Sequence, residues 1–381
     1  MRVELRILHV DMASHVWGGE IIAASVSASL RKRGHTCAFV CLENSQVAAY
    51  VRCRGLDRFE MPCRPGEGAP LPLIRIARIA RWFKPDIVHI YRGAEYVWAS
   101  LGVKIGAPRS AVVITRTIPF STGRLLTRYL RFLRARVIAV STFVKCHLLV
   151  RGFLEDGVDV IPCGIDLSLF ELAEPRLFSG NERPSTLAII GRISPEKGHK
   201  HLVMAVRQLV DAGRQISLQI VGTGELEERL RALVRRRHLE DIVRFNGYRS
   251  DVRPFLREVD VLVMPSLYDG FGLAALEAMA CGIPVVVTDR CGIIEHIVSG
   301  QTGMIAQTGN VGDIAAKIAQ LLDDPQLARR VGLAGRELVA KRFTDDKVAA
   351  QIERVYMKAL RGKPRSQVSK RTQRDNAEGG D

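Results

Sequence analysis

The chain has 381 residues, of which 47% are hydrophobic and 25% are charged, and its formal net charge is +16. These proportions exclude a chain that is disordered throughout, because they supply enough apolar side chains for a core, and the length suggests two domains. No run of about 18 apolar residues occurs, and charged residues interrupt the N-terminal stretch. We therefore expect neither a membrane-spanning helix nor a secretory signal, but a soluble, cytoplasmic protein.

Short apolar runs alternate with helical stretches through the first half of the chain. The first run, residues 5–10, precedes Gly18 and Gly19, which open an Ala/Ser/Leu-rich helical stretch that ends near Arg33. Further runs lie at residues 35–41, 85–91, 111–115 and 137–141. Short buried strands that alternate with helices are typical of a parallel, doubly wound sheet.

The same alternation returns in the second half, with apolar runs at residues 186–190, 217–221, 243–245, 259–264 and 284–288. Residues 171–184 contain prolines, a glycine and polar side chains, which is typical of a linker. We therefore predict an α/β protein with domains at residues 1–170 and 185–343 that face each other across a cleft. A helix at residues 344–360 and a disordered basic tail at residues 361–381 complete the prediction.

The positive charge is concentrated in the first half, where residues 1–175 carry a net charge of +9, against +4 for residues 176–360. Arg124, Arg128 and Arg131 recur there at the spacing of one helix face. A basic amphipathic helix of this kind either binds an anionic membrane surface or forms a solvated outer face. Nucleic acid is not expected as a partner, because the chain lacks the common binding motifs and only 6% of its residues are aromatic.

We expect no metal site and no cofactor. The eight cysteines form no Cys-x-x-Cys pair and no paired histidines accompany them, so we interpret them as reduced thiols that pack in the core. The turn at Gly222 lacks the third glycine of the dinucleotide fingerprint, which argues against a nicotinamide dehydrogenase. The chain also has no Asp-x-Asp pair to hold a metal-bridged diphosphate.

Glycine-rich turns follow several of the predicted strands, at the ends where doubly wound sheets bind ligands. Gly18 and Gly19 open a helix whose amide groups can meet an anion, or they form a plain tight turn. The loop at residues 191–198 carries Arg192 and Lys197, which together suit a diphosphate. The alternative for these two cations is a role in surface solubility.

The strongest signal is the turn within residues 265–284, where a strand end is followed by Asp269, a glycine-rich turn and a helix that carries Glu277. Backbone amides converge at the mouth of such a turn. One carboxylate could then address a sugar while the other accepts hydrogen bonds from ribose hydroxyls. The alternative is a helix-capping Asp and a solvated Glu.

Together these segments resemble the retaining, nucleotide-sugar-dependent glycosyltransferases of family 4, which have the GT-B fold. The resemblance covers residues 5–355 and is most specific at residues 191–198, 269–284 and 295–303. It implies two Rossmann-like domains, the first for an acceptor and the second for a nucleotide-sugar donor. It also implies that Arg192 and Lys197 bind the donor diphosphate and that Glu277 holds the ribose.

The resemblance implies further donor contacts. Asp269 is expected to touch the sugar, and Tyr248 is expected to lie beside the base. Backbone groups complete the implied donor site, at Gly18, Gly19, Gly222, Gly270, Phe271, Gly272 and Leu273.

Two positions depart from the family pattern. Asp269 stands where the family usually has Glu, and Arg116 stands where many members place a substrate-facing His. Arg116 would bind an anionic group of the donor or acceptor, or fix its own loop. His89 is a second polar candidate for the acceptor or sugar, with a core histidine as its alternative interpretation.

The implied function is transfer of a hexose from a UDP- or GDP-sugar to a cell-envelope acceptor, such as lipopolysaccharide, a polysaccharide or a lipid-linked glycan. The resemblance implies retention of the anomeric configuration, without a metal, and the basic helices suggest the inner face of the cell membrane. Two alternatives stay open. One is another GT-B enzyme, such as a phosphorylase or a sugar-nucleotide epimerase, and the other is a nucleotide-sugar-binding assembly protein without activity.

Overall fold

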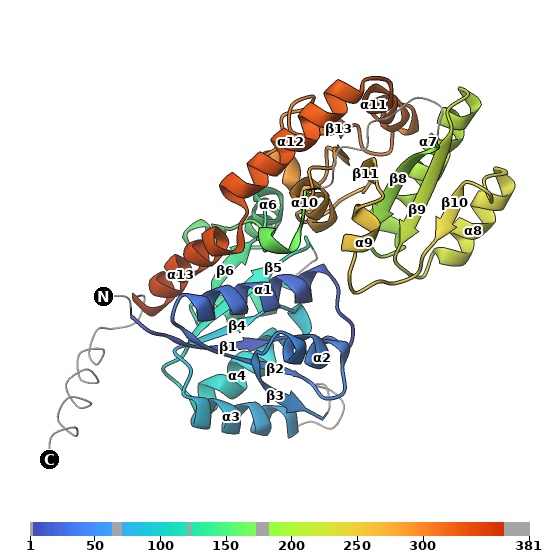
Figure 1. Cartoon of the computed structure of the whole chain (residues 1–381). Coiled ribbons are helices and arrows are strands. Elements are labelled where there is room, and N and C mark those ends of the chain that lie inside the picture. The colour runs from blue at the N-terminus through green and yellow to red at the C-terminus, as the bar shows by residue number, and fades with distance from the viewer. Residues whose placement is uncertain (1–2, 63–70, 120–122, 173–182, 362–381) are drawn as a thin grey trace, which may run out of the picture.

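Two parallel β-sheets, one in each half of the chain, form the framework of the computed structural model, which describes residues 3–62, 71–119, 123–172 and 183–361 (Figure 1). The first sheet has the order β3-β2-β1-β4-β5-β6-β7, and its neighbouring strands are all parallel. Its strands are β1 (Arg6–Val10), β2 (Thr36–Leu42), β3 (Asp57–Met61), β4 (Ile87–Ile90), β5 (Ala111–Arg116), β6 (Arg136–Ala139) and β7 (Val158–Val160).

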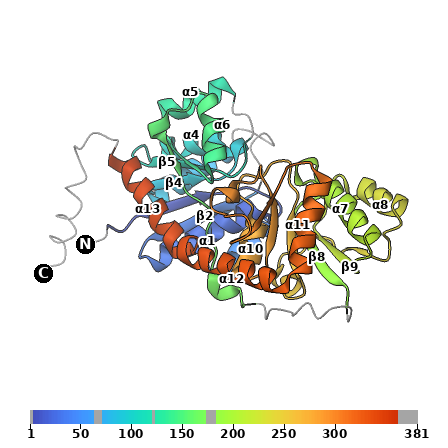
Figure 2. The same cartoon turned by 90° about the horizontal axis from the view of Figure 1, so that it is seen from above.

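Helices cover both faces of the first sheet, so the central strands β4 and β5 are buried along their whole length. Figure 2 shows α4, α5 and α6 gathered on one side of this sheet and α1 on the other. The helices of this half are α1 (Gly18–Lys32), α2 (Gln46–Cys53), α3 (Leu71–Phe83), α4 (Tyr96–Gly106), α5 (Arg124–Phe132) and α6 (Thr142–Val150).

The second sheet repeats the same design with the order β10-β9-β8-β11-β12-β13, again with parallel neighbours. Its strands are β8 (Ser185–Ile190), β9 (Ile216–Val221), β10 (Val243–Phe245), β11 (Val261–Met264), β12 (Val285–Thr288) and β13 (Met304–Ala306). Its helices are α7 (His199–Asp211), α8 (Glu227–Arg236), α9 (Arg253–Leu256), α10 (Leu273–Ala280), α11 (Val311–Asp323) and α12 (Pro325–Arg342).

The predicted strands all occur, and the structure adds β3, β7 and β13, which the sequence analysis missed. Each of these three is an edge strand, paired on one side only. An edge strand tolerates charged side chains, as in Asp57-Arg-Phe-Glu-Met61, so no continuous apolar run marks it. The predicted linker at residues 171–184 and the predicted tail at 361–381 lie outside the described residues, except for positions 171, 172, 183, 184 and 361.

The last helix, α13 (Asp345–Arg361), leaves the second domain and lies against the first (Figures 1 and 2). Thr344 pairs with Ile165 in an isolated parallel bridge, and Arg33 at the end of α1 donates to Glu353 at 2.5 Å. The buried face of α13 includes Tyr356, which is fully buried. The chain therefore connects the two domains a second time at residues 343–345.

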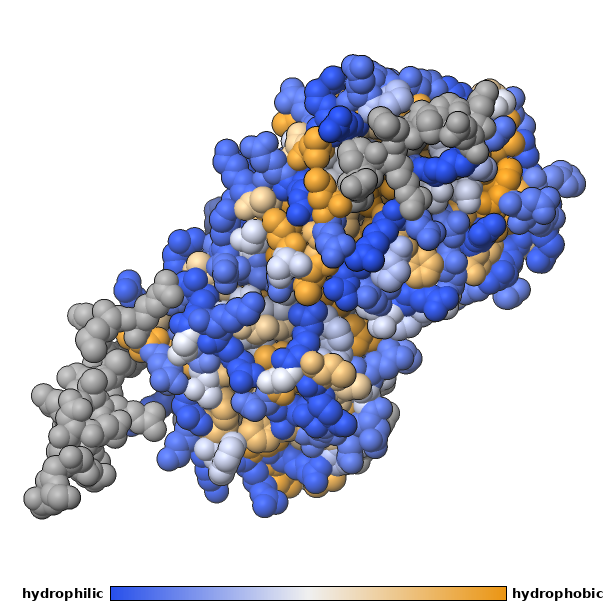
Figure 3. All heavy atoms as spheres, viewed as in Figure 1, coloured by the Kyte–Doolittle hydropathy of each residue, from blue (hydrophilic) through white to orange (hydrophobic). Residues whose placement is uncertain are grey.

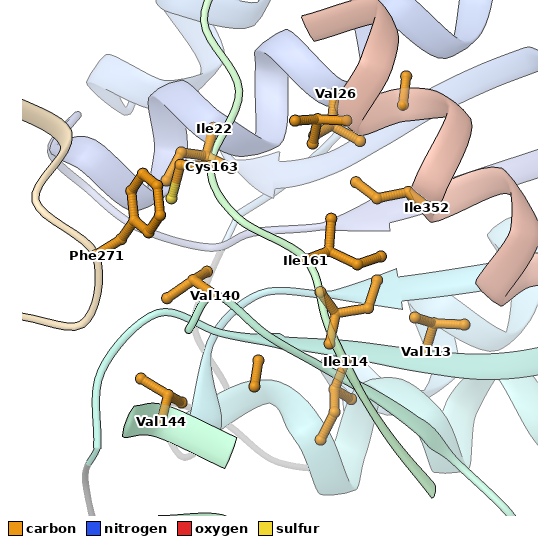
Figure 4. Close-up of a cluster of buried hydrophobic side chains, with 14 of the residues drawn as sticks. Ile22, Val26, Val113, Ile114, Val140, Val144, Ile161, Cys163, Phe271 and Ile352 are labelled. Atoms are coloured by element: carbon orange, nitrogen blue, oxygen red, sulfur yellow. The ribbon is translucent and has the colours of Figure 1, made fainter. Parts of the chain in front are cut away.

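One hydrophobic cluster extends from the first domain across to α10 in the second. Figure 4 shows Phe271, just before α10, beside Ile22, Val140 and Cys163 of the first domain. Phe271 is 2% exposed. The loop that precedes α10 is thereby held against the first domain by apolar packing as well as by polar contacts.

Polar and charged side chains cover most of the face in Figure 3, with smaller apolar areas among them. None of the helices in the described ranges is long and apolar enough to cross a membrane. Among the described cysteines, Cys37, Cys41, Cys163, Cys281 and Cys291 are buried as expected, whereas Cys53 and Cys146 are exposed and do not pack in the core. Burial raises the pKa of the Cys37 and Cys41 thiols to about 12. These two thiols are therefore neutral packing groups.

Candidate active site

A cleft of about 1090 Å³ opens between the carboxyl ends of the two sheets, slightly larger than most ligand pockets. Each sheet reverses its strand order beside this cleft, between β1 and β4 in the first and between β8 and β11 in the second. Such reversal points are where doubly wound sheets bind ligands. The predicted residues that line the cleft are Gly18, Gly19, Arg116, Arg192, Lys197, Gly222, Tyr248, Asp269, Phe271, Gly272, Leu273 and Glu277.

Lys197 lies at the second reversal point, in the loop after β8. Its Nζ is 2.5 Å from Oδ2 of Asp269, in the loop after β11. Burial alone would lower the pKa of Lys197, but the charge and hydrogen bond of Asp269 outweigh it and raise the pKa. Lys197 is therefore a fixed cation at neutral pH, held between the two loops.

Arg192 precedes Lys197 in the same loop and is held more loosely. Its guanidinium donates to Oε1 of Glu196 at 3.0 Å, and half of the side chain is exposed. Arg192 lines the cleft, and its planar group has further N–H donors besides the one bonded to Glu196. The loop after β8 thus presents one fixed and one adaptable cation.

Two glycines allow the loops of the second domain to meet backbone to backbone. At Gly198, with φ of +69°, a side chain would overlap the carbonyl oxygen of Pro265, and at Gly222, with φ of +140°, it would overlap that of Gly191. Both conformations and both approaches favour glycine. Gly222 therefore lines the cleft while keeping the loops after β8 and β9 together.

Asp269 is tied into its loop through both carboxylate oxygens. Oδ1 accepts a hydrogen bond from the Phe271 amide at 3.2 Å, and Oδ2 pairs with Lys197. The turn continues through Gly272, with φ of +104°, directly into α10, so that unpaired amides at the start of this helix lie at the cleft. In this structure Asp269 orients Lys197 and the loop.

Glu277 lies on α10 and is 8% exposed at the wall of the cleft. Burial, and to a lesser degree the charge of Asp251, raise the pKa of its carboxyl group to about 8. The group is thus mostly protonated at pH 7. A ligand that donates hydrogen bonds to the carboxylate would favour its ionised form.

The two domains touch directly beside the part of the cleft that the second domain lines. The Ser141 hydroxyl donates to the carbonyl of Gly270 at 2.7 Å, and a side chain at Gly270 would overlap the carbonyl oxygen of Thr117. Gly270 itself is not part of the cleft lining. At Gly270 the first domain contacts the loop after β11 directly.

Two further contacts bridge the domains. The Tyr248 hydroxyl donates to the Val16 carbonyl at 2.7 Å, and its ring lies edge-on to Trp17. Glu295 accepts hydrogen bonds from the amides of Thr142 and Phe143, both at 3.1 Å, so its carboxylate caps the N-terminus of α6. Tyr248 therefore joins the domains at the edge of the cleft, a role its sequence position did not indicate.

His89 and Arg116, the two acceptor candidates, lie in different surroundings. His89 is fully buried, with Nδ1 2.6 Å from the Tyr356 hydroxyl and Nε2 2.7 Å from that of Thr115, and it is absent from the cleft lining. These partners support the core-histidine interpretation. Arg116 is 8% exposed at the end of β5 and does line the cleft.

The sequence analysis missed three charged residues at the first reversal point. Asp11 follows β1, and Arg92 and Glu95 follow β4; Asp11 and Arg92 line the cleft. Only Asp11 has a sequence signal, a polar residue directly after a buried strand, because Arg92 and Glu95 lie beyond Tyr91 in the segment after β4. Among the described residues, no group of three or more His, Cys, Asp and Glu side chains is placed to hold a metal ion.

Two facing parallel sheets that close over one cleft are the architecture of the GT-B glycosyltransferases. The crystal structure of HepE from Anabaena in complex with UDP-glucose superposes with a TM-score of 0.82 at 22% identity, over 93% of this chain and 100% of that one. Family models match both halves: "Glycosyltransferase Family 4" over residues 16–169 and "Glycosyl transferases group 1" over residues 176–338. The chain belongs to glycosyltransferase family 4.

Named relatives cover most of the chain. It is 27% identical to the 2-deoxystreptamine glucosyltransferase of Streptomyces kanamyceticus, over 71% of this chain and 77% of that protein. It is also 27% identical to WcaL of Salmonella typhimurium, a glycosyltransferase named for colanic acid biosynthesis, over 72% of this chain and 71% of that one. The alignment with the glycogen synthase of Mycobacterium tuberculosis covers 50% of that protein, so the chain spans about half its length.

Proposed function

We propose that this glycosyltransferase moves a hexose, with retention of configuration, from a UDP- or GDP-sugar to a cell-envelope acceptor. The observation that carries the proposal is the fixed cation of Lys197 at the second reversal point, with Arg192 in the same loop. A diphosphate leaving group needs such neutralisation. HepE, which has the same fold, was crystallised with UDP-glucose, and WcaL is named for an envelope polysaccharide.

In the proposed reaction, the bond between the anomeric carbon and the diphosphate oxygen breaks, and its electron pair stays on the diphosphate. The acceptor oxygen bonds to the anomeric carbon on the same face, and its proton passes to the departing diphosphate oxygen. Lys197 and Arg192 stabilise the charge that develops on that oxygen. Asp269 acts here by holding Lys197, because its two oxygens already accept hydrogen bonds from Lys197 and the Phe271 amide.

The direct test is nucleotide release. The protein is incubated with a panel of UDP-, GDP- and ADP-sugars, with and without envelope glycan and glycolipid extracts, and free nucleoside diphosphate is measured. We expect one nucleotide-sugar to release its nucleotide only when an acceptor is present. Release without any acceptor-dependent increase, for every donor, would contradict the proposed transfer.

Nucleotide binding should strengthen as the pH rises from 7 to 9. The pKa of Glu277 is raised to about 8, and the proposed ribose contact is made by its ionised form, which accepts stronger hydrogen bonds. We expect UDP or GDP affinity to rise by roughly three- to tenfold over this range, because a hydrogen bond to the ionised Glu277 carboxylate is about 1 kcal/mol stronger than one to the neutral carboxyl group. Calorimetric titration of wild type and Glu277→Gln measures it, and equal pH dependence in both proteins would contradict the ribose contact.

A membrane-facing role is proposed for α5, which packs on α4 through Tyr129 and turns its other face outward. That face carries Arg124 and Arg128 together with Leu125 and Phe132, which are 81% and 84% exposed. Large apolar side chains between exposed arginines match the interface of an anionic bilayer. The sequence pattern showed the arginines but not that Leu125 and Phe132 are exposed beside them.

Reversing the charges of α5 should weaken binding to anionic vesicles. We expect Arg124→Glu/Arg128→Glu/Arg131→Glu to reduce binding to phosphatidylglycerol vesicles by about tenfold or more, since each basic residue near such a surface contributes about 1 kcal/mol. Leu125→Ser/Phe132→Ser should also reduce it, by removing the inserted apolar groups. Vesicle co-sedimentation measures both, with phosphatidylcholine vesicles as the neutral comparison.

The matched control reverses three exposed arginines on α8, in the second domain: Arg229→Glu/Arg235→Glu/Arg236→Glu. This variant has the same change in net charge as the α5 variant but keeps α5 intact. It should therefore bind anionic vesicles more tightly than the α5 variant. Equal loss in the two charge variants, or no loss in either, would contradict a role for α5.

A further inference from the structure

The first domain has its own set of charged residues at its own reversal point. Asp11 follows β1, Arg92 follows β4, and Arg116 ends β5; all three line the cleft. They lie opposite the cations of the second domain, which the proposed donor site uses. The proposed donor site uses none of these three charged residues, so they remain to bind the acceptor.

Arg92 and Arg116 occupy corresponding positions at the ends of two neighbouring parallel strands, because β4 and β5 pair in a register that places Ile90 beside Ile114. A Cβ atom at Gly93 would lie 3.2 Å from Nη1 of Arg116, and Arg92 immediately precedes this glycine. The guanidinium of Arg116 lies 5.9 Å from the ring centre of Tyr96, which supports it from one side. Two neighbouring strands thus deliver two guanidinium groups to one part of the cleft.

The carboxyl group paired with Arg92 offsets little of the charge of this arginine. Nε of Arg92 is 3.9 Å from Oε1 of Glu95, a long ion pair, and that oxygen already accepts a hydrogen bond from the Met12 amide at 2.9 Å. Glu95 and Asp11 are 3% and 1% exposed. Burial raises the pKa of both carboxyl groups, and the charge of Glu20 raises that of Asp11 further, as the charge of Asp11 does for Glu95, so the two groups together hold less than their full negative charge.

Asp11 also presents an oxygen that suits a hydroxyl group. Its Oδ1 accepts a hydrogen bond from the Ala13 amide at 3.1 Å, whereas its buried Oδ2 has no hydrogen-bond partner in the described structure. A buried polar oxygen without a partner is costly unless a ligand satisfies it. An acceptor hydroxyl that donates to Oδ2 would remove that cost.

We infer that the acceptor carries an anionic group, a phosphate or a carboxylate, which Arg92 and Arg116 bind through paired hydrogen bonds while Asp11 accepts from a nearby hydroxyl. The planar guanidinium group presents paired N–H donors that match two oxygens of a phosphate or a carboxylate. Arg116 is followed by Thr117, whose carbonyl abuts Gly270 at the donor loop. The anion site is therefore next to the proposed sugar site, on which the inference rests.

The test first saturates the proposed donor site with a nucleotide and then measures the binding of a second anion to the protein. The protein is saturated with whichever of UDP, GDP and ADP binds best, and inorganic phosphate or acetate is titrated by calorimetry. We expect one anion site in wild type and an affinity at least about tenfold lower in Arg92→Gln/Arg116→Gln. Tighter binding of phosphate than acetate assigns a phosphate-bearing acceptor, and the reverse assigns a carboxylate.

The control, Arg229→Gln/Arg235→Gln on α8, should bind the titrated anion as wild type does. Nucleotide affinity of the Arg92→Gln/Arg116→Gln protein shows that it is folded. Nucleotide binding with no second anion site, or with the same site in that variant, would overturn the inference alone. Failure of every nucleotide to bind would overturn the proposed function and the inference together.

Discussion

Replacement of Lys197 by alanine should lower kcat by roughly 10²–10³ while the protein stays folded. The amine is held 2.5 Å from Asp269, before any donor binds, so its position needs no rearrangement when charge develops on the diphosphate. Removing one preorganised group of this kind raises a reaction barrier by about 3–4 kcal/mol. Steady-state nucleotide release, with the thermal unfolding midpoint measured in parallel, tests the expectation.

Lys200→Ala is the matched control, because Lys200 is exposed on α7 three residues farther along and does not line the cleft. Its kcat should equal that of wild type. Lys197→Ala also leaves Asp269 without its cation, so Lys197→Ala/Asp269→Asn separates the loss of the amine from the presence of an unpaired carboxylate. If Lys197→Ala alone turned over at the wild-type rate, Lys197 would not be the group that neutralises the leaving diphosphate.

Adding one methyl group at Gly270 should nearly abolish turnover without unfolding either domain. A Cβ there would overlap the Thr117 carbonyl, which belongs to the other domain, and φ at Gly270 is not positive, so alanine fits the local backbone. The domains would therefore have to separate. A displacement of about 1 Å between reacting groups costs up to about 10² in rate, and we expect a loss of at least that size.

Small-angle scattering with bound nucleotide should show a larger radius of gyration for Gly270→Ala than for wild type. Gly157→Ala is the control, since a Cβ at Gly157 would meet open space and its φ is also not positive. It should match wild type in both rate and radius. Unchanged turnover of Gly270→Ala would show that the contact with Thr117 is not needed for the reaction.

Sequence patterns predicted the parts of the site that are local in the chain. Arg192 and Lys197 share one loop after a buried strand, and Glu277 follows its turn within one helix, so spacing alone brings each near a strand end. The pairing of Lys197 with Asp269 joins residues 72 positions apart. Only the adjacency of β8 and β11 brings them together, and that adjacency depends on strand order.

The part of the cleft that the first domain lines was predicted less well, for the same reason. Asp11, Arg92 and Arg116 come from three separate strands, and no motif connects them. His89 was a candidate because it was expected as a polar residue at a strand end, but Tyr356, 267 residues later, covers it. The edge strands were missed because their charged side chains interrupt the apolar pattern, as in β3.

The chain passes between the domains twice, once through residues 171–184 and again at residues 343–345, where Thr344 pairs with Ile165. The two domains also meet at Gly270 against Thr117 and at Tyr248 against Val16. A change in the angle between the domains would have to break these contacts, so together they define the closed position of the cleft.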